Sequence, residues 1–153
     1  NYEARANLMW SSSLALNHIL TVGKGGAWSC HPIEHELSAY YDITHGEGLA
    51  IVTPAWMKAV LCDTTVERFA MFGKNVWDIT EGDSREIAEK AIEKTAEFFK
   101  SLGLPSTLKE VGISSEKFEE MAEEAVRTSG IAVRSYYHLD KEDIVKIYES
   151  CAE

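Results

Sequence analysis

The spacing of apolar residues between Ser84 and Leu102 constrains the fold more than any other feature of the chain. Ile87, Ala91 and Thr95 recur every four positions and share one face of an α-helix, whereas a strand would need alternating apolar residues. Similar spacing predicts further helices over residues 2–20, 29–41, 48–62, 64–77, 114–130 and 140–151. Only the short segment 131–137 could be extended. We therefore expect an all-α fold, a bundle of several helices.

The chain organisation indicates a single helical domain spanning residues 1–153. Its length lies within the range of about 100–200 residues that one domain usually occupies, and it contains no internal repeat or low-complexity linker. Apolar residues surround the predicted helix over residues 2–20 almost completely, so we expect this helix to lie deep in the fold. Pro54 is expected to kink or divide the helix predicted over residues 48–62.

Charge and hydropathy exclude two classes of partner. The chain has 15 basic and 25 acidic residues and a formal net charge of -10, which repels the phosphates of nucleic acids and anionic lipids. Its longest apolar run, residues 49–62, includes Lys58 and is shorter than the roughly 20 residues that span a bilayer. We therefore expect neither a nucleic-acid partner nor a membrane partner.

The cysteines indicate a reducing environment. Cys30, Cys62 and Cys151 are odd in number and widely spaced, and they form no Cys-x-x-Cys pair. This pattern predicts neither a disulfide framework nor a thiolate zinc site, and a cytoplasmic location fits it best.

A cluster of histidines is the strongest functional signal. His31, His35 and His45 lie within the string CHPIEHELSAYYDITHGEG. His31 and His35 are four positions apart and share a helix face, and His45 lies far enough along the chain to fold back toward the start of that helix. Imidazole is a common ligand of Zn²⁺ and Fe²⁺. The spacing therefore predicts a shared metal site.

Two other interpretations remain open from these residues. His31, Glu34 and His35 also match H-x-x-E-H, a zinc-hydrolase pattern in which the glutamate acts as the base. Alternatively, the histidines are structural and the chain is a non-catalytic helical interaction module. If the chain is not such a hydrolase, we expect Glu34 and Glu36 to lie at the surface or around the ligands, and Glu34→Gln to have little effect.

The longer string HPIEHELSAYYDITHGEGLAIVTPAWM resembles the iron-containing alcohol dehydrogenases, and within them the butanol-dehydrogenase-like branch. The segments YEARANLMWSSSLALN and FFKSLGLPSTLKEVGI extend the resemblance over most of the chain. It implies the helical C-terminal domain of a dehydroquinate-synthase-like, two-domain enzyme. Such an enzyme holds Fe²⁺ or Zn²⁺ and NAD(H) or NADP(H) between its domains and interconverts small primary alcohols, such as butanol, and aldehydes.

The resemblance also assigns residue roles. By position, His31 and His45 match two metal ligands of the family. His35 matches a histidine near the nicotinamide and substrate that moves the proton, and so it is the expected catalytic and cofactor-binding residue.

Half of the expected site has no counterpart in this sequence. The family's other two ligands are an aspartate and a histidine four residues later, and no such pair occurs among the thirty residues before His31. Gly23, Gly25 and Gly26 follow a predicted helix rather than a strand, so they do not form a dinucleotide-binding turn. We interpret the chain as part of a longer polypeptide whose N-terminal nucleotide-binding domain is missing, and we expect it to be inactive alone. The oligomeric state, including a possible homodimer, stays open.

Overall fold

The computed structural model describes residues 1–23 and 28–153, and within them the chain is helical with no strand. The α-helices are α1 (Tyr2–Leu16), α2 (Cys30–Tyr41), α3 (His45–Ala59), α4 (Val66–Trp77), α5 (Ser84–Ser101), α6 (Phe118–Thr128), α7 (Ile131–Arg134) and α8 (Lys141–Ser150). Short 3-10 turns form η1 (Ile19–Thr21), η2 (Lys109–Val111) and η3 (Ser115–Lys117). The predicted all-α class is confirmed.

Some local expectations need correction. The segment that could have been extended begins instead with the short helix α7. Pro54 does not divide α3, which is continuous through it. Two of the three glycines in the predicted loop, Gly25 and Gly26, lie outside the described residues.

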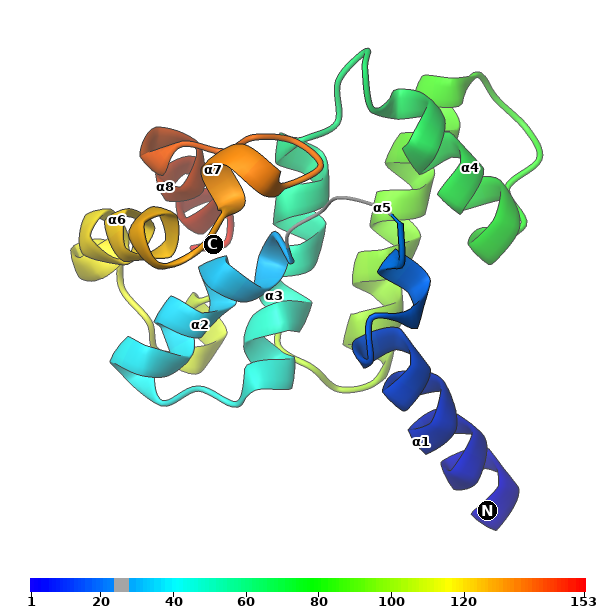
Figure 1. Cartoon of the computed structure of the whole chain (residues 1–153), viewed down its shortest axis with the longest axis horizontal. Coiled ribbons are helices and arrows are strands. Elements are labelled where there is room, and N and C mark those ends of the chain that lie inside the picture. The colour runs from blue at the N-terminus through cyan, green and yellow to red at the C-terminus, as the bar shows by residue number, and fades with distance from the viewer. Residues whose placement is uncertain (24–27) are drawn as a thin grey trace.

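The main core lies where α2, α3, α6 and α8 pack together (Figure 1). Each of these helices contributes an apolar stripe that is removed from water, which is the dominant favourable term in folding. The fully buried side chains of this core include Ile33, Leu37, Val52, Met121, Ile144, Ile147 and Tyr148. The two helices that carry the histidine string, α2 and α3, are therefore held by the centre of the domain.

One buried hydrogen bond ties α8 to α2. The hydroxyl of Tyr148 donates to the carbonyl oxygen of Ile33 at 2.6 Å, and the Tyr148 ring stacks on Phe118 with a centroid separation of 5.3 Å. Burial raises the pKa of Tyr148, so the hydroxyl keeps the proton that it donates. The contact positions the segment of α2 that lies between His31 and His35.

Tyr148→Phe is expected to lower the free energy of unfolding by about 0.5–1.5 kcal/mol, because it removes one buried hydrogen bond and keeps the ring. Urea denaturation followed by circular dichroism measures this change. Tyr40→Phe is the matched control, since the Tyr40 side chain is exposed. Equal stability losses in the two variants would contradict the assigned role of the Tyr148 hydroxyl.

A second, smaller core joins α4 and α5. It contains Ala70, Ile79, Ile87 and Ala91, and the two helices approach closely at Gly73. A Cβ atom at Gly73 would lie 2.8 Å from Cγ2 of Ile87, so only glycine allows this separation without a shift. The pair lies beside the main core, with α5 next to α3 (Figure 1).

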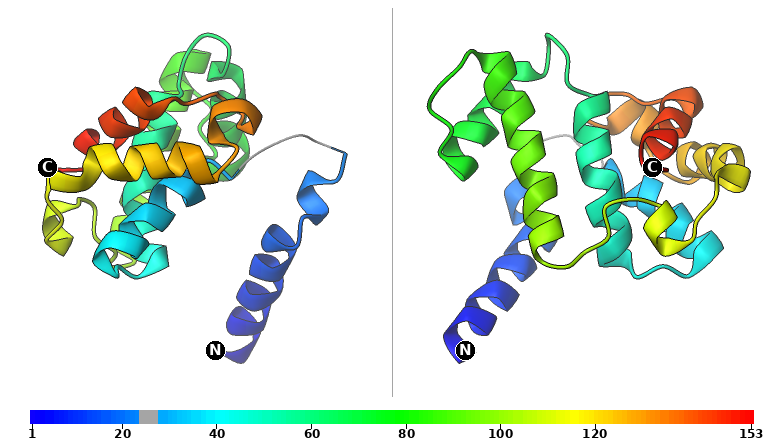
Figure 2. Two further views of the ribbon diagram at one scale, coloured as in Figure 1. Left: turned by 60° about the vertical axis from the view of Figure 1, so that its left-hand side comes forward. Right: turned by 180° about the vertical axis from the view of Figure 1, so that it is seen from behind.

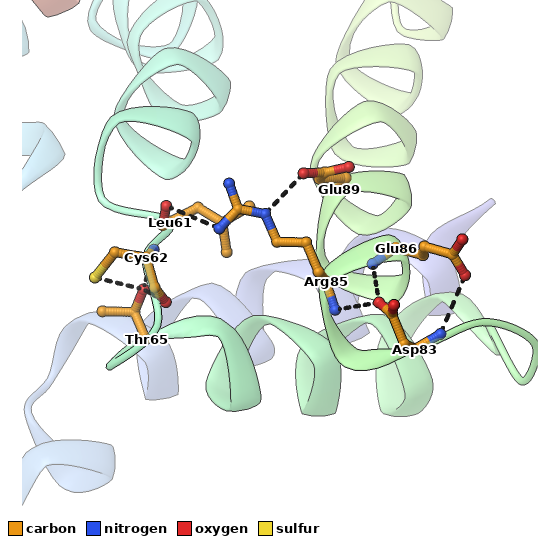
Figure 3. A network of polar contacts seen from close by, with 7 residues as sticks. All are labelled: Leu61, Cys62, Thr65, Asp83, Arg85, Glu86 and Glu89. Carbon is orange, nitrogen blue, oxygen red and sulfur yellow. Dashed lines mark hydrogen bonds and ion pairs between the residues drawn. The ribbon is translucent and has the colours of Figure 1, made fainter.

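A polar network at the start of α5 connects it to the end of α3 (Figure 3). The side chain of Asp83 accepts from the backbone N–H groups of Arg85 and Glu86, and Glu86 accepts from the N–H of Asp83, which completes a capping box. The Arg85 guanidinium donates to the carbonyl of Leu61 at 3.4 Å and to Glu89 at 2.8 Å. The predicted start of α5 is confirmed.

The position of α1 differs from the expectation that it would lie deep. No residue of α1 is buried, and Leu8, Met9 and Trp10 are 71%, 70% and 67% exposed. The helix extends away from the remaining helices (Figure 2, left). The expectation was wrong because apolar residues on all sides of a helix show only that the helix favours burial. They do not show which other part of the protein would cover it.

Candidate metal centre

The turn between α2 and α3 brings the histidine string together. Asp42 adopts a left-handed backbone conformation with φ of 53°, which ends α2 and lets the chain reverse. His45 then opens α3 rather than lying in a connection, so it occupies the first turn of that helix. The hydroxyl of Ser38 lies 3.2 Å from the carbonyl oxygen of Ile43 and supports the reversal.

The three imidazoles form one cluster. The ring centroids of His31 and His45 are 5.2 Å apart, those of His35 and His45 are 5.4 Å apart, and those of His31 and His35 are 5.9 Å apart. Two imidazoles on one tetrahedral metal place their ligating nitrogens roughly 3.3–3.5 Å apart. The three rings therefore adjoin one another at the start of α2 and α3.

The cluster is open to solvent on one side. His35 and His45 are exposed, and the His45 side chain retains 47% of its accessible surface. His31 is half-buried, and its ring meets Trp28 edge-on at a centroid distance of 4.4 Å. Burial, followed by the proximity of His45 and His35, lowers the pKa of His31. The lowered pKa favours the neutral imidazole, which is the form that binds metals.

Glu34 was expected to lie either at the surface or around the ligands, and the structure excludes the surface position. Its side chain is fully buried between α2 and α3, where Oε1 accepts a hydrogen bond from Ser38 Oγ at 2.6 Å and Oε2 contacts Nδ1 of His45. Glu36 is half-buried. The burial of Glu34 follows from its position beside Ile33 and Leu37 on the inner face of α2, a signal that helical periodicity could have supplied.

This arrangement argues against the zinc-hydrolase interpretation. In the H-x-x-E-H pattern the glutamate must reach a water molecule as a general base, and His45 has no role. Here both carboxylate oxygens of Glu34 face protein groups, and one of those groups is His45.

The donor set fits part of a metal site. Potential ligand atoms of Glu34, His35 and His45 all lie within 4.8 Å of one another. The predicted ligand His31 is not part of this group, although its ring centroid lies 5.2 Å from that of His45. Imidazole nitrogens and a carboxylate are suitable ligands for Fe²⁺ and Zn²⁺. The assignment of His31 and His45 as ligands, and of His35 as the proton-moving residue, stays a prediction.

Cys30 and His18 are two further side chains near the histidine cluster. Burial raises the pKa of the Cys30 thiol to about 12, so this neighbour of His31 is an inert thiol rather than a thiolate ligand. His18 is exposed, and the nearest aromatic contact of its ring is with Trp28 at 6.0 Å.

These features define a class of protein, namely a helical domain that presents a three-histidine site at the open junction of two helices. The family model described as "Fe-containing alcohol dehydrogenase family, C-terminal" matches residues 1–152. The chain belongs to this family, and the match covers its C-terminal part.

Similar proteins agree with this membership. NADH-dependent butanol dehydrogenase A of Clostridium acetobutylicum is 56% identical over 150 residues, which cover 97% of this chain and 39% of that protein. The crystal structure of NADH-dependent butanol dehydrogenase A from Thermotoga maritima superposes with a TM-score of 0.87 at 38% identity, over 100% of this chain and 40% of that one. The structure of Escherichia coli YqhD superposes with a TM-score of 0.89 at 30% identity, and the match covers 99% of this chain and 38% of that one.

The chain spans about two fifths of the length of these relatives. Within the described residues, no helix is both long enough and apolar enough to cross a membrane.

Proposed function

We propose that this chain forms the metal-binding C-terminal domain of a longer NAD(P)-linked alcohol dehydrogenase that interconverts small primary alcohols, such as butanol, and their aldehydes. The observation that carries the proposal is the convergence of His31, His35 and His45 at the open junction of α2 and α3. The names of the relatives, which include NADH-dependent butanol dehydrogenases and an NADPH-dependent aldehyde reductase, support the substrate class.

In this proposal each histidine has a distinct task. His31 and His45 hold Fe²⁺ or Zn²⁺ together with ligands from outside this chain. When bound, such a metal supplies Lewis-acid polarisation of an alcohol or carbonyl oxygen. His35, which is exposed beside both rings, carries the hydroxyl proton between the reacting oxygen and water, a general acid–base task that histidine often performs in enzymes. The same exposure lets His35 contact the nicotinamide.

The remaining parts of the proposal concern what surrounds the domain. A nucleotide-binding domain elsewhere in the longer protein would cover the open side of the histidine cluster and hold NAD(H) or NADP(H). A cytoplasmic location is supported by the three free cysteines Cys30, Cys62 and Cys151.

A chimera tests this function. Residues 1–153 replace the corresponding part of Clostridium acetobutylicum butanol dehydrogenase A, which is 56% identical to them over 150 residues. We expect the purified chimera to oxidise butanol and reduce butyraldehyde with NADH, whereas the 153-residue chain alone shows no turnover at any added Fe²⁺ or Zn²⁺. A folded chimera without turnover, beside an active parent enzyme, would overturn the proposal. So would turnover by the isolated chain.

A further inference from the structure

The proposed function assigns no task to the buried carboxylate of Glu34. Its side chain is 0% exposed, and a carboxylate removed from water is unfavourable unless hydrogen bonds or a charge partner compensate. Glu34 has two such partners, because Oε1 accepts from Ser38 Oγ at 2.6 Å and Oε2 contacts Nδ1 of His45. One partner is therefore a hydroxyl on its own helix, and the other is a histidine of the candidate metal site.

The first turn of α3 is shaped to receive this carboxylate. A Cβ atom at Gly48 would lie 2.6 Å from both Cγ and Oε1 of Glu34, a distance that real contacts do not reach. The absence of a side chain at Gly48 therefore makes the space that Glu34 occupies. The N-terminus of a helix carries a partial positive charge, which favours a carboxylate at this end of α3.

The contact with Glu34 leaves His45 one free ring nitrogen. A neutral imidazole carries its proton on one nitrogen and a lone pair on the other. A carboxylate beside Nδ1 favours the proton there, so the lone pair is held on Nε2. Histidines that bind metals commonly donate their second ring N–H to a carboxylate, which fixes the ring orientation and raises the basicity of the ligand nitrogen.

We propose that Glu34 is a positioning residue that accepts the Nδ1–H of His45 and holds Nε2 of that ring ready to bind a metal. The proposal rests on the proposed function, which makes His45 a ligand. It agrees with the expectation from sequence that Glu34→Gln has little effect, because the amide oxygen of glutamine can also accept this N–H. Direct metal binding by Glu34 is less favoured, because both of its oxygens already have partners and its side chain has no exposed surface.

The protonation pattern of His45 tests the inference without any metal. Long-range ¹H–¹⁵N spectra of the 153-residue chain, recorded above the titration range of histidine, report which ring nitrogen carries the proton. We expect the Nδ1–H form for His45 in the wild type and in Glu36→Gln, a matched control on the same helix. Glu34→Ala should shift His45 toward the Nε2–H form. A wild-type His45 in the Nε2–H form, or an unchanged pattern in Glu34→Ala, would overturn the proposal.

Glu34→Gln keeps the inference testable if Glu34→Ala does not fold. The amide oxygen can still accept the Nδ1–H, so the proton should stay on Nδ1 although the charge is gone. A His45 that moves to the Nε2–H form in Glu34→Gln would contradict the expected rescue by a neutral acceptor.

Metal titration separates this inference from the proposed function. Co²⁺ serves as the probe, and its visible absorption reports the affinity and the ligand set. We expect Glu34→Ala to weaken Co²⁺ binding by about 10–100-fold, as is typical when a residue that supports a ligand is lost, with little change in the shape of the spectrum. A changed coordination spectrum would identify Glu34 as a ligand instead. If the wild type bound no Co²⁺, the result would contradict the proposed metal-binding function of this chain. The ¹H–¹⁵N spectra of His45 would still decide whether Glu34 positions that ring.

Discussion

His31→Ala and His45→Ala are each expected to remove the bound metal from the chimera, whereas His35→Ala keeps the metal and loses turnover. Loss of a residue that supports a ligand weakens metal binding by about 10–100-fold, and loss of a ligand itself should weaken it more. His35→Ala should lower kcat by about 10²–10⁴-fold, the usual contribution of a general acid–base group. The roles are expected to differ because the sequence resemblance assigns His31 and His45 as ligands, while His35 is an exposed ring beside them.

Elemental analysis of the purified variants measures the metal content, and steady-state assays with NADH measure kcat. His18→Ala serves as the control, because His18 is exposed and lies outside the cluster. If the metal content fell in His35→Ala and held in His45→Ala, the assignment of the ligands would be wrong.

Leu37→Ala is expected to lower the free energy of unfolding of the 153-residue chain by about 2–5 kcal/mol, because Leu37 is fully buried and its loss leaves a cavity in the main core. Leu8→Ala, at a helix-interior position of α1 that is 71% exposed, should change it by no more than about 0.5 kcal/mol. The pair is matched, since both changes replace leucine by alanine inside a helix and alter helix propensity equally.

Chemical denaturation followed by circular dichroism measures both values. If Leu8→Ala and Leu37→Ala lowered the free energy of unfolding equally, by several kcal/mol, α1 would pack against the rest of the chain in solution. Such a result would restore the original expectation that this helix lies deep.

The sequence by itself determined the helical class and located the histidine cluster. Helical periodicity depends on neighbours within about two turns. For this reason the spacing of apolar residues could predict the start of α5 at Ser84. The helix predicted over residues 140–151 is confirmed as α8, which begins at Lys141 after a capping box formed by Asp140 and Asp143. The histidine string also depends on local spacing, since His31 and His35 are one helical turn apart.

Only the tertiary structure decided where α1 lies and what Glu34 contacts. Both depend on surfaces that come from distant parts of a chain, and helical periodicity carries no information about which surfaces meet. The apolar residues of α1 predicted burial, yet the described helices complete their core without it. Glu34 is buried against His45 because the backbone reverses at Asp42 and because Gly48 leaves space for its carboxylate. The position of the Glu34 side chain relative to α3 follows from how α2 and α3 pack together, and residue spacing alone does not specify this packing.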